Sequence, residues 1–136
     1  MAFDRVRGDK IRKTVILDSS SILAFFEFSV DWEKELNRLL DGYCIVIPTE
    51  IIKELELLSK QTASERKRKA AAALKLVGRY KTVETLAMNA DDAVIEAAKK
   101  TQGVVVTNDM ELRKRLNDDS IPVIFLRGKK KLALEE

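Results

Sequence analysis

The stretch TVILDSSSIL, residues 14–23, decides the fold class, because an apolar strand pattern ends in an acid and passes directly into a helix pattern. Its first half predicts a buried β-strand and its second half starts a helix. The same order returns in VVVTNDMELRKRL, residues 104–116. Asp18 and Asp109 therefore stand where these two strands end. Because parallel strands end at the same edge of a sheet, we expect the two acids to be neighbours.

Strand and helix patterns alternate along the rest of the chain, which favours an α/β fold with a mainly parallel sheet of about five strands. The remaining strands are predicted at residues 43–47, 81–86 and 123–126. The helices are predicted at residues 20–28, 32–40, 50–59, 64–77, 90–101 and 110–116. Residues that favour helix starts or helix ends flank several of these helices: Asp31, Thr49 and Asn89 as N-caps, and Gly42, Gly78 and Gly103 as ends.

The size and composition suit one compact domain, since 46% of the 136 residues are hydrophobic and 35% are charged. We expect it to span residues 1–136, with a basic lead over residues 1–13 and a charged tail over residues 127–136. No apolar run approaches the roughly 20 residues of a membrane-spanning helix, and the start MAFDRVRGDKIRK lacks the apolar stretch of a secretory signal. We therefore expect a cytoplasmic protein with no membrane partner.

The chain contains no histidine and a single cysteine, Cys44. These counts exclude a disulfide within the chain, a multi-cysteine zinc site, serine–histidine triads and histidine metal sites. Any catalysis must therefore rely mainly on carboxylates, lysines, hydroxyl groups and metal ions.

A group of acids is predicted at strand ends or in helix turns that face them: Asp18, Glu54, Asp91, Asp92 and Asp109. Carboxylate oxygens are the ligands that Mg²⁺ and Mn²⁺ prefer, and two such ions can stabilise the attacking and leaving oxygens of a phosphodiester. Each acid also has an ordinary explanation, because Asp18 and Asp109 could cap helices and Glu54 could lie on the surface. Their convergence on one sheet edge favours the metal site.

Helical geometry distinguishes the adjacent acids Asp91 and Asp92. Asp91 shares a face with apolar residues of its helix, whereas Asp92 shares one with charged residues, so we expect Asp91 to face the cleft and keep Asp92 as an alternative ligand. Ser20, Thr107 and Asn108 could orient carboxylates or bound waters, or could simply form turns and caps. Ser19 and Ser21 carry no separate signal.

The basic residues fall into clusters although the formal net charge is only +3. A cluster, rather than the total, decides whether a polyanion such as a nucleic acid finds a binding surface, although solvated faces are the simpler explanation. The clusters are Arg5, Arg7, Lys10, Arg12 and Lys13; Arg66, Lys67, Arg68 and Lys69; and Arg127, Lys129, Lys130 and Lys131.

The segments ILDSSSIL, VIPTEIIKELELL, NADDAVIEAA, VVVTNDMELRKRL and PVIFLRGKKKL together resemble the PIN-domain metal-dependent ribonucleases. The likeness is to small archaeal PIN proteins, related to VapC-type toxins and to nucleases that process ribosomal RNA. The family's motifs match these positions in turn: Asp18 with Ser20, Glu54 in preference to Glu50 or Glu56, Asp91 or Asp92, and Thr107 with Asp109.

This resemblance implies a three-layer α/β/α sandwich, Mg²⁺ or Mn²⁺ among the acids, an RNA substrate and a frequent homodimer. It also implies an antitoxin or a ribosome-assembly protein as partner, and the basic tail after Arg127 is more similar to the processing branch than to a short toxin. We predict a single-strand-selective endoribonuclease in which Asp18, Glu54, Asp91 and Asp109 hold the ions and a metal-activated water attacks phosphorus.

Two other functions remain alternatives. A non-catalytic RNA-binding or ribosome-assembly module could keep the PIN fold without cutting. A phosphoacceptor domain similar to response-regulator receivers also places aspartates at strand ends, but it needs an acidic pair beside the first strand. Here the doublet lies late in the chain, at Asp91 and Asp92, so this alternative ranks lowest.

Overall fold

The computed structural model describes residues 12–61 and 65–135, and its centre is a six-stranded sheet in the order β3-β2-β1-β4-β5-β6. The strands are β1 (Lys13–Leu17), β2 (Tyr43–Pro48), β3 (Lys81–Val83), β4 (Val104–Val106), β5 (Val123–Arg127) and β6 (Lys131–Leu134). The first five are parallel and β6 runs antiparallel to β5. The α/β prediction is confirmed, although β3 ends three residues earlier than the pattern indicated.

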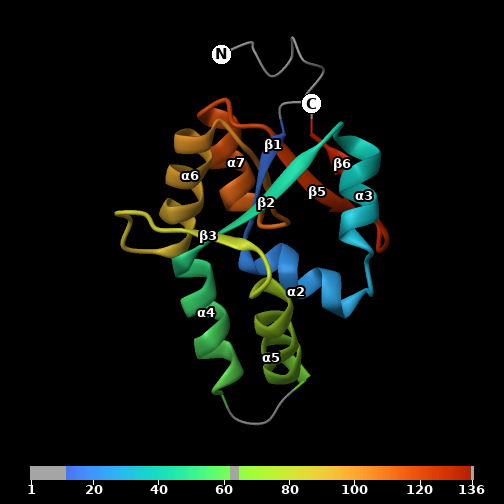
Figure 1. Ribbon diagram of the computed structural model, residues 1–136, viewed down its shortest axis with the longest axis vertical. Helices are drawn as coiled ribbons and strands as arrows, with labels where there is room; N and C mark the ends of the chain where they lie inside the picture. The colour runs from blue at the N-terminus through green and yellow to red at the C-terminus, as the bar shows by residue number, and fades with distance from the viewer. Residues whose placement is uncertain (1–11, 62–64, 136) are drawn as a thin grey trace.

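Six helices cover the sheet in the described part of the chain. They are α2 (Ser19–Glu27), α3 (Trp32–Leu39), α4 (Thr49–Ser59), α5 (Glu65–Val77), α6 (Ala90–Thr101) and α7 (Met110–Asp118). Figure 1 shows α6 and α7 on one side of the strands and α2 and α3 on the other, while α4 and α5 lie side by side beyond the end of the sheet. Within residues 12–61 and 65–135, none of the helices has the length and apolar content that a bilayer crossing requires.

The buried parts of the central strands are apolar because helices cover both faces of the sheet. The last three residues of β1 and all of β4 are at most 1% exposed. In register, Val15 lies beside Ile45 of β2 and Val104 of β4. The strand order reverses between β1 and β4, because β1 leads outward to β2 and β3 while β4 leads to β5. The carboxyl ends of β1 and β4 therefore form the switch point where ligands bind in such sheets.

The predicted charged tail contains the sixth strand, which the sequence pattern did not indicate. Gly128, with a φ of +69°, lies in the turn between β5 and β6. Glu35, only 6% exposed on α3, accepts a hydrogen bond from the Leu132 backbone N–H at 2.9 Å. Arg38 donates to the Leu132 carbonyl oxygen at 2.6 Å and to Glu35 at 2.8 Å. Side chains of α3 therefore hold β6 in place.

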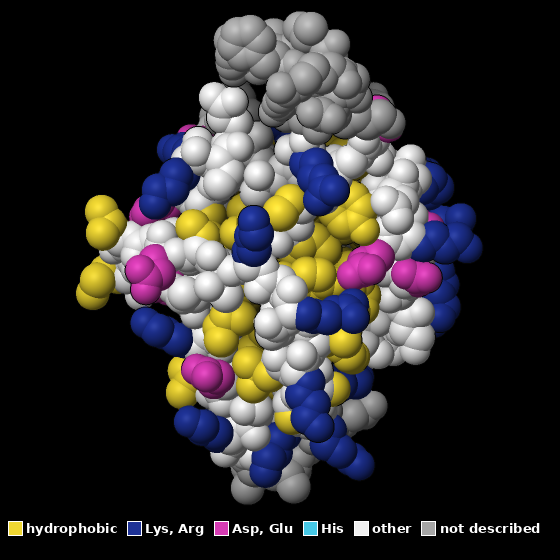
Figure 2. Space-filling model, viewed as in Figure 1, with side chains coloured by type: hydrophobic (Ala, Val, Ile, Leu, Met, Phe, Trp, Pro, Cys, Tyr) yellow, Lys and Arg dark blue, Asp and Glu magenta, His cyan; other side chains and the backbone are white. Residues whose placement is uncertain are grey.

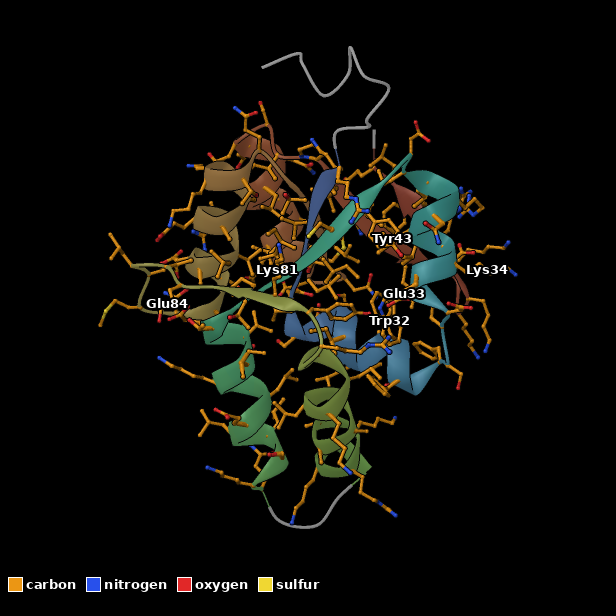
Figure 3. The ribbon with its side chains drawn as sticks, in the orientation of Figure 1. Trp32, Glu33, Lys34, Tyr43, Lys81 and Glu84 are labelled. Carbon is orange, nitrogen blue, oxygen red and sulfur yellow. The ribbon has the colours of Figure 1, made fainter. Side chains whose placement is uncertain are left out.

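The start of α3 packs on β2 through a polar and aromatic cluster, and Figure 3 shows Trp32, Glu33 and Tyr43 close together there. The Trp32 indole N–H donates to the Tyr80 hydroxyl at 3.0 Å, and that hydroxyl donates to Glu33 at 2.5 Å. Tyr43 donates to the Glu33 carbonyl oxygen at 3.3 Å. Trp32 also stacks on Phe25 of α2, with ring centroids 5.1 Å apart. This cluster fixes α2 and α3 relative to β2.

Two helix caps are confirmed and one is wrong. Asp31 and Asn89 accept backbone N–H bonds at the starts of α3 and α6, as predicted. Thr49 is instead the first residue of α4, and its hydroxyl donates to Glu50.

The end of α6 also differs from the prediction that Gly103 terminates the helix. Gln102 adopts the left-handed conformation there, with a φ of +53°. Gly103 is needed for another reason, because a Cβ at this position would lie 2.7 Å from the Thr14 carbonyl oxygen. The glycine thus permits the close approach of the chain to β1 just before β4 begins.

Candidate active site

Asp18 follows β1 directly and is only 5% exposed. Its carboxylate accepts hydrogen bonds from the Ser21 backbone N–H at 2.8 Å, from the Ser20 hydroxyl at 2.9 and 3.0 Å, and from the Thr107 hydroxyl. Burial raises the pKa of Asp18, and these hydrogen bonds oppose the rise. Asp18 therefore both caps α2 and faces the end of β4.

The residues after β4 are tied to the residues after β1. Thr107 is fully buried, and its hydroxyl accepts a hydrogen bond from the Asp109 backbone N–H at 3.0 Å. The Asn108 backbone N–H donates to the Ser20 hydroxyl at 3.3 Å, while the Asn108 side-chain oxygen accepts from the Leu126 N–H of β5 at 2.8 Å. The three polar residues singled out in the sequence thus join β1, β4 and β5 at one edge.

Asp109 caps α7, because one of its carboxylate oxygens accepts from the backbone N–H groups of Glu111 and Leu112 at 2.9 and 3.1 Å. Its other oxygen has no hydrogen-bond partner among the described residues. The ordinary capping explanation is therefore correct for both Asp18 and Asp109. It leaves oxygen lone pairs of Asp109 free for a ligand at the same time.

Asp91 lies in the first turn of α6 and is half-buried. Burial is the largest cause of its raised pKa, and the negative charges of Asp109 and Glu54 raise the pKa further, against the opposing Arg115 guanidinium. Carboxylates carried by α4, α6 and the start of α7 therefore lie close enough to repel one another.

Glu54 lies on α4 and is held by Ser19, a residue for which the sequence analysis predicted no role. The Ser19 hydroxyl donates to Glu54 Oε1 at 2.5 Å. Ser19 directly follows Asp18 in the chain, so its hydrogen bond ties Glu54 to the segment that carries Asp18. The two partners lie 35 positions apart in the chain, and no local pattern signals such a contact.

Asp92 points away from this group. Its carboxylate accepts from Arg115 at 2.6 Å and from the Asn89 side chain at 2.9 Å, and the Arg115 hydrogen bond is the largest cause of its lowered pKa. It lines a separate depression with Lys99 and Lys100. The structure therefore brings Asp91, and not Asp92, together with the other acids.

The alternatives to Glu54 lie elsewhere on α4. Glu50 accepts hydrogen bonds from Thr49 and from the Thr85 hydroxyl, at 3.2 and 3.0 Å, and Glu56 is exposed. Neither is among the charges that act on Asp91.

The acids fit a hard divalent cation by their chemistry. Asp18, Glu54, Asp91 and Asp109 offer only carboxylate oxygens, and a cation would relieve the repulsion that Asp109 and Glu54 exert on Asp91. Within residues 12–61 and 65–135, no three potential ligands are already gathered closely enough to hold a metal ion. The acids are therefore not gathered into a closed metal cage in this part of the structure.

The cations of the β5–β6 turn are exposed, but one of them is engaged by the backbone. Lys130 donates to the backbone oxygens of Phe28 and Ser29 at the end of α2, at 2.7 and 3.5 Å. Arg127, Lys129 and Lys131 are exposed, and we call these three residues the hairpin cations.

The basic run on α5 contributes to a positively charged face. Figure 2 shows Lys and Arg side chains gathered over the lower half of one face, over α4 and α5. Arg68 is exposed, whereas Lys67 and Lys69 are half-buried and Lys69 lies 3.8 Å from Glu27. The structure does not describe the Arg66 side chain, and Arg5, Arg7 and Lys10 lie outside the described residues.

Comparisons with known proteins agree with the fold. A family model described as a PIN like domain matches residues 15–129. Ribonuclease VapC4 of Methanocaldococcus jannaschii is 35% identical over 120 residues, which cover 85% of this chain and 92% of that protein. Ribonuclease VapC9 of Archaeoglobus fulgidus is 31% identical over 136 residues, which cover 99% of this chain and 98% of that protein.

Solved structures show the same architecture at low sequence identity. The PIN domain endonuclease Utp24 superposes with a TM-score of 0.74 at 22% identity, covering 90% of each chain. A domain of a functionally unknown protein from Methanocaldococcus jannaschii superposes with a TM-score of 0.60 at 19% identity, covering 91% of this chain and 95% of that one.

The match to VapC9 extends over nearly the whole chain, including the residues after Arg127. The likeness of the basic tail to the processing branch stays a prediction. The family model covers well over half of the chain, and two relatives exceed 30% identity over most of its length. The chain belongs to the PIN-like domain family.

Proposed function

We propose that the chain is a divalent-metal-dependent endoribonuclease with Asp18, Glu54, Asp91 and Asp109 as its metal ligands. One observation carries the proposal: the charges of Glu54 and Asp109 act on Asp91 at the sheet edge where Asp18 is buried. The names of the two VapC relatives, both ribonucleases, support the reaction class.

Mg²⁺ or Mn²⁺, when bound, would supply the Lewis acidity that lowers the pKa of water and stabilises charge on phosphate oxygens. The protein's own residues would place that ion. Ser20 and Thr107 hold the Asp18 carboxylate in one orientation, and the α7 backbone fixes one oxygen of Asp109. The negative charges of Asp109, Glu54 and Asp92 disfavour ionised Asp91, and a cation would relieve that repulsion.

RNA would bind as a single strand through its phosphates. The hairpin cations offer phosphate-binding groups near the carboxyl end of β5. Exposed cations on α4 and α5, such as Arg68, offer more of them. Binding of this kind weakens as the salt concentration rises.

Asp18→Asn tests the proposal with Asp31→Asn as a matched control. Both aspartates cap a helix, because Asp18 accepts from the Ser21 N–H and Asp31 from the Lys34 N–H at 3.2 Å. An asparagine oxygen can still accept the capping bond, so both variants should keep the fold. We expect Asp18→Asn to abolish Mn²⁺-dependent cleavage of single-stranded RNA, and Asp31→Asn to cleave normally.

Equal cleavage by both variants would show that Asp18 acts as a helix cap only, and would refute the nuclease site. RNA binding that survives metal removal, with no cleavage in Mn²⁺, would instead identify a non-catalytic RNA-binding or assembly module.

The VapC relatives also favour a toxin role with a protein antitoxin as partner, in place of a ribosome-assembly protein. Expression of the wild-type chain should then arrest the growth of a host cell, while Asp18→Asn should not. Equal growth of the two strains, at equal protein levels, would contradict the toxin role. A cytoplasmic location and a homodimer stay predictions of the sequence.

A further inference from the structure

The SSS run after Asp18 contains three serines with three different partners. The Ser20 hydroxyl donates to the Asp18 carboxylate, and the Ser21 hydroxyl donates to the Asp18 carbonyl oxygen at 2.9 Å. Both bonds stay within the first turn of α2. The Ser19 hydroxyl crosses to another helix and donates to Glu54 Oε1 at 2.5 Å. Ser19 is thus the member of the run that connects Asp18 to a second acid.

This bond matters because a glutamate side chain is flexible. Glu54 is only half-buried, so its rotatable bonds would sample several rotamers without a partner. The neighbouring Lys53 does not hold Glu54, because its ammonium lies 4.0 Å from Glu50. The Ser19 bond occupies Oε1, and Oε2 has no hydrogen-bond partner among the described residues. One oxygen of Glu54 is therefore held while the other stays available.

The charge of the held carboxylate reaches Asp91, since it contributes to the raised pKa of Asp91. Hydrogen bonds from neighbouring groups orient metal-binding side chains in proteins, and their loss typically weakens metal binding by about 10- to 100-fold. Ser19 stands in that relation to Glu54, while Ser20 and Thr107 stand in it to Asp18.

We propose that Ser19 is a positioning residue for divalent-cation binding, because its hydroxyl holds the Glu54 carboxylate on the side of Asp91. The inference rests on the proposed function, which makes Glu54 a metal ligand. Loss of the hydroxyl leaves the ligand in place but frees it to move. We therefore expect Mn²⁺ binding to weaken by about tenfold, at the lower end of the range for such partners.

The test is a Mn²⁺ titration by calorimetry on the wild type, Ser19→Ala, Ser19→Thr and Ser59→Ala. Ser59→Ala is the matched control, because the Ser59 hydroxyl donates to the Glu56 carbonyl oxygen at 2.7 Å on the same helix as Glu54. Ser19→Ala should bind Mn²⁺ about tenfold more weakly. Ser19→Thr, which keeps the hydroxyl, and Ser59→Ala should bind as the wild type does. Melting temperatures without metal check that each variant is folded.

A double-mutant cycle separates positioning from a general structural effect. In the Glu54→Gln background, where the anionic ligand is gone, Ser19→Ala should produce no further loss of affinity. A tenfold loss in both backgrounds would show that Ser19 does not act through Glu54, and would overturn the inference. If Ser19→Ala does not fold, Ser19→Cys, with its weaker thiol donor, takes its place with an expected smaller loss.

The outcomes also separate this inference from the proposed function. A wild-type protein that binds Mn²⁺ but cuts no RNA would refute the nuclease proposal, while a Ser19→Ala defect in binding would still support the positioning role. Wild-type affinity in Ser19→Ala would overturn the positioning role alone. A wild-type protein that does not bind Mn²⁺ would overturn both.

Discussion

Thr107→Val should destabilise the protein far more than the loss of one hydroxyl usually does. Thr107 is fully buried between the two sheet-edge acids. Its hydroxyl donates to the Asp18 carboxylate and accepts from the Asp109 backbone N–H at 3.0 Å. Valine has nearly the same volume, so the change removes both hydrogen bonds without opening a cavity.

The expected loss follows from these two bonds. A hydrogen bond to a buried charged group contributes roughly 1.5–3 kcal/mol, and an ordinary backbone bond about 1 kcal/mol. The free energy of unfolding should therefore fall by about 3 kcal/mol. For a domain of this size each kcal/mol corresponds to roughly 3 °C, so the melting temperature should fall by about 10 °C.

The loss should also depend on pH. Burial raises the pKa of Asp18 above its ordinary 3.8, and the Thr107 hydrogen bond is the largest influence that lowers it again. Because the folded pKa is raised, the charge of Asp18 costs stability as the pH rises from below 3.8 through the folded pKa. Thr107→Val raises that pKa further, so its destabilisation should be larger at pH 7 than at pH 4.

The assay is urea unfolding of both proteins at several pH values, with Thr101→Val as the control. The Thr101 hydroxyl donates to the Ala97 carbonyl oxygen at 2.8 Å within α6 and contacts no acid. We expect the control to lose less than about 1 kcal/mol at every pH. If Thr107→Val loses no more than the control, or loses the same amount at pH 4 and pH 7, the reasoning about Asp18 is refuted.

The other predictions concern the β6 contact, the approach to β1 and RNA binding. The Arg38 hydrogen bond is the largest cause of the lowered pKa of Glu35, so the stability it gives is present above the ordinary 4.5 and lost as the pH falls through the folded value. Urea midpoints should consequently drop more steeply in acid for the wild type than for Glu35→Gln; parallel curves would contradict this. Gly103→Ala, which places a Cβ 2.7 Å from the Thr14 carbonyl oxygen, should cost about 3 kcal/mol in chemical denaturation. Gly128→Ala, with nothing within 4 Å, should cost only about 1–2 kcal/mol for its left-handed backbone, and equal losses would refute the close-contact argument. Replacing the three hairpin cations by glutamine should lower the salt slope of single-stranded RNA binding by about 2, as measured by fluorescence anisotropy, and an unchanged slope would exclude them from the interface.

Local chemistry was enough to predict most of the fold. The short apolar runs that become β1 and β4 are buried on both faces, and such runs are typical of strands in a covered parallel sheet. Asp31 and Asn89 form caps with N–H groups three residues away, which a short sequence window contains. Helical phase likewise separated Asp91 from Asp92, because the buried face of α6 decides which of the two turns inward.

Contacts between distant segments explain what the sequence did not predict. The residues of β6 carry little strand signal of their own, and Leu132 is held by Glu35, 97 positions away. The Ser19–Glu54 bond joins α2 to α4 in the same way and made one serine of a uniform run different from its neighbours. Such pairings exist only once the tertiary fold has formed, so a pattern of nearby residues cannot report them.

The side chains that hold β6 also protect a margin of the sheet against other proteins. An outer strand with free N–H and C=O groups can recruit a strand from another chain, which is a common start of aggregation. Glu35 and Arg38 occupy both backbone groups of Leu132 on that margin. On the opposite margin, β3 is only three residues long and begins at the exposed Lys81, a residue that disfavours strand addition. Both margins of the sheet therefore offer little to a strand from another chain.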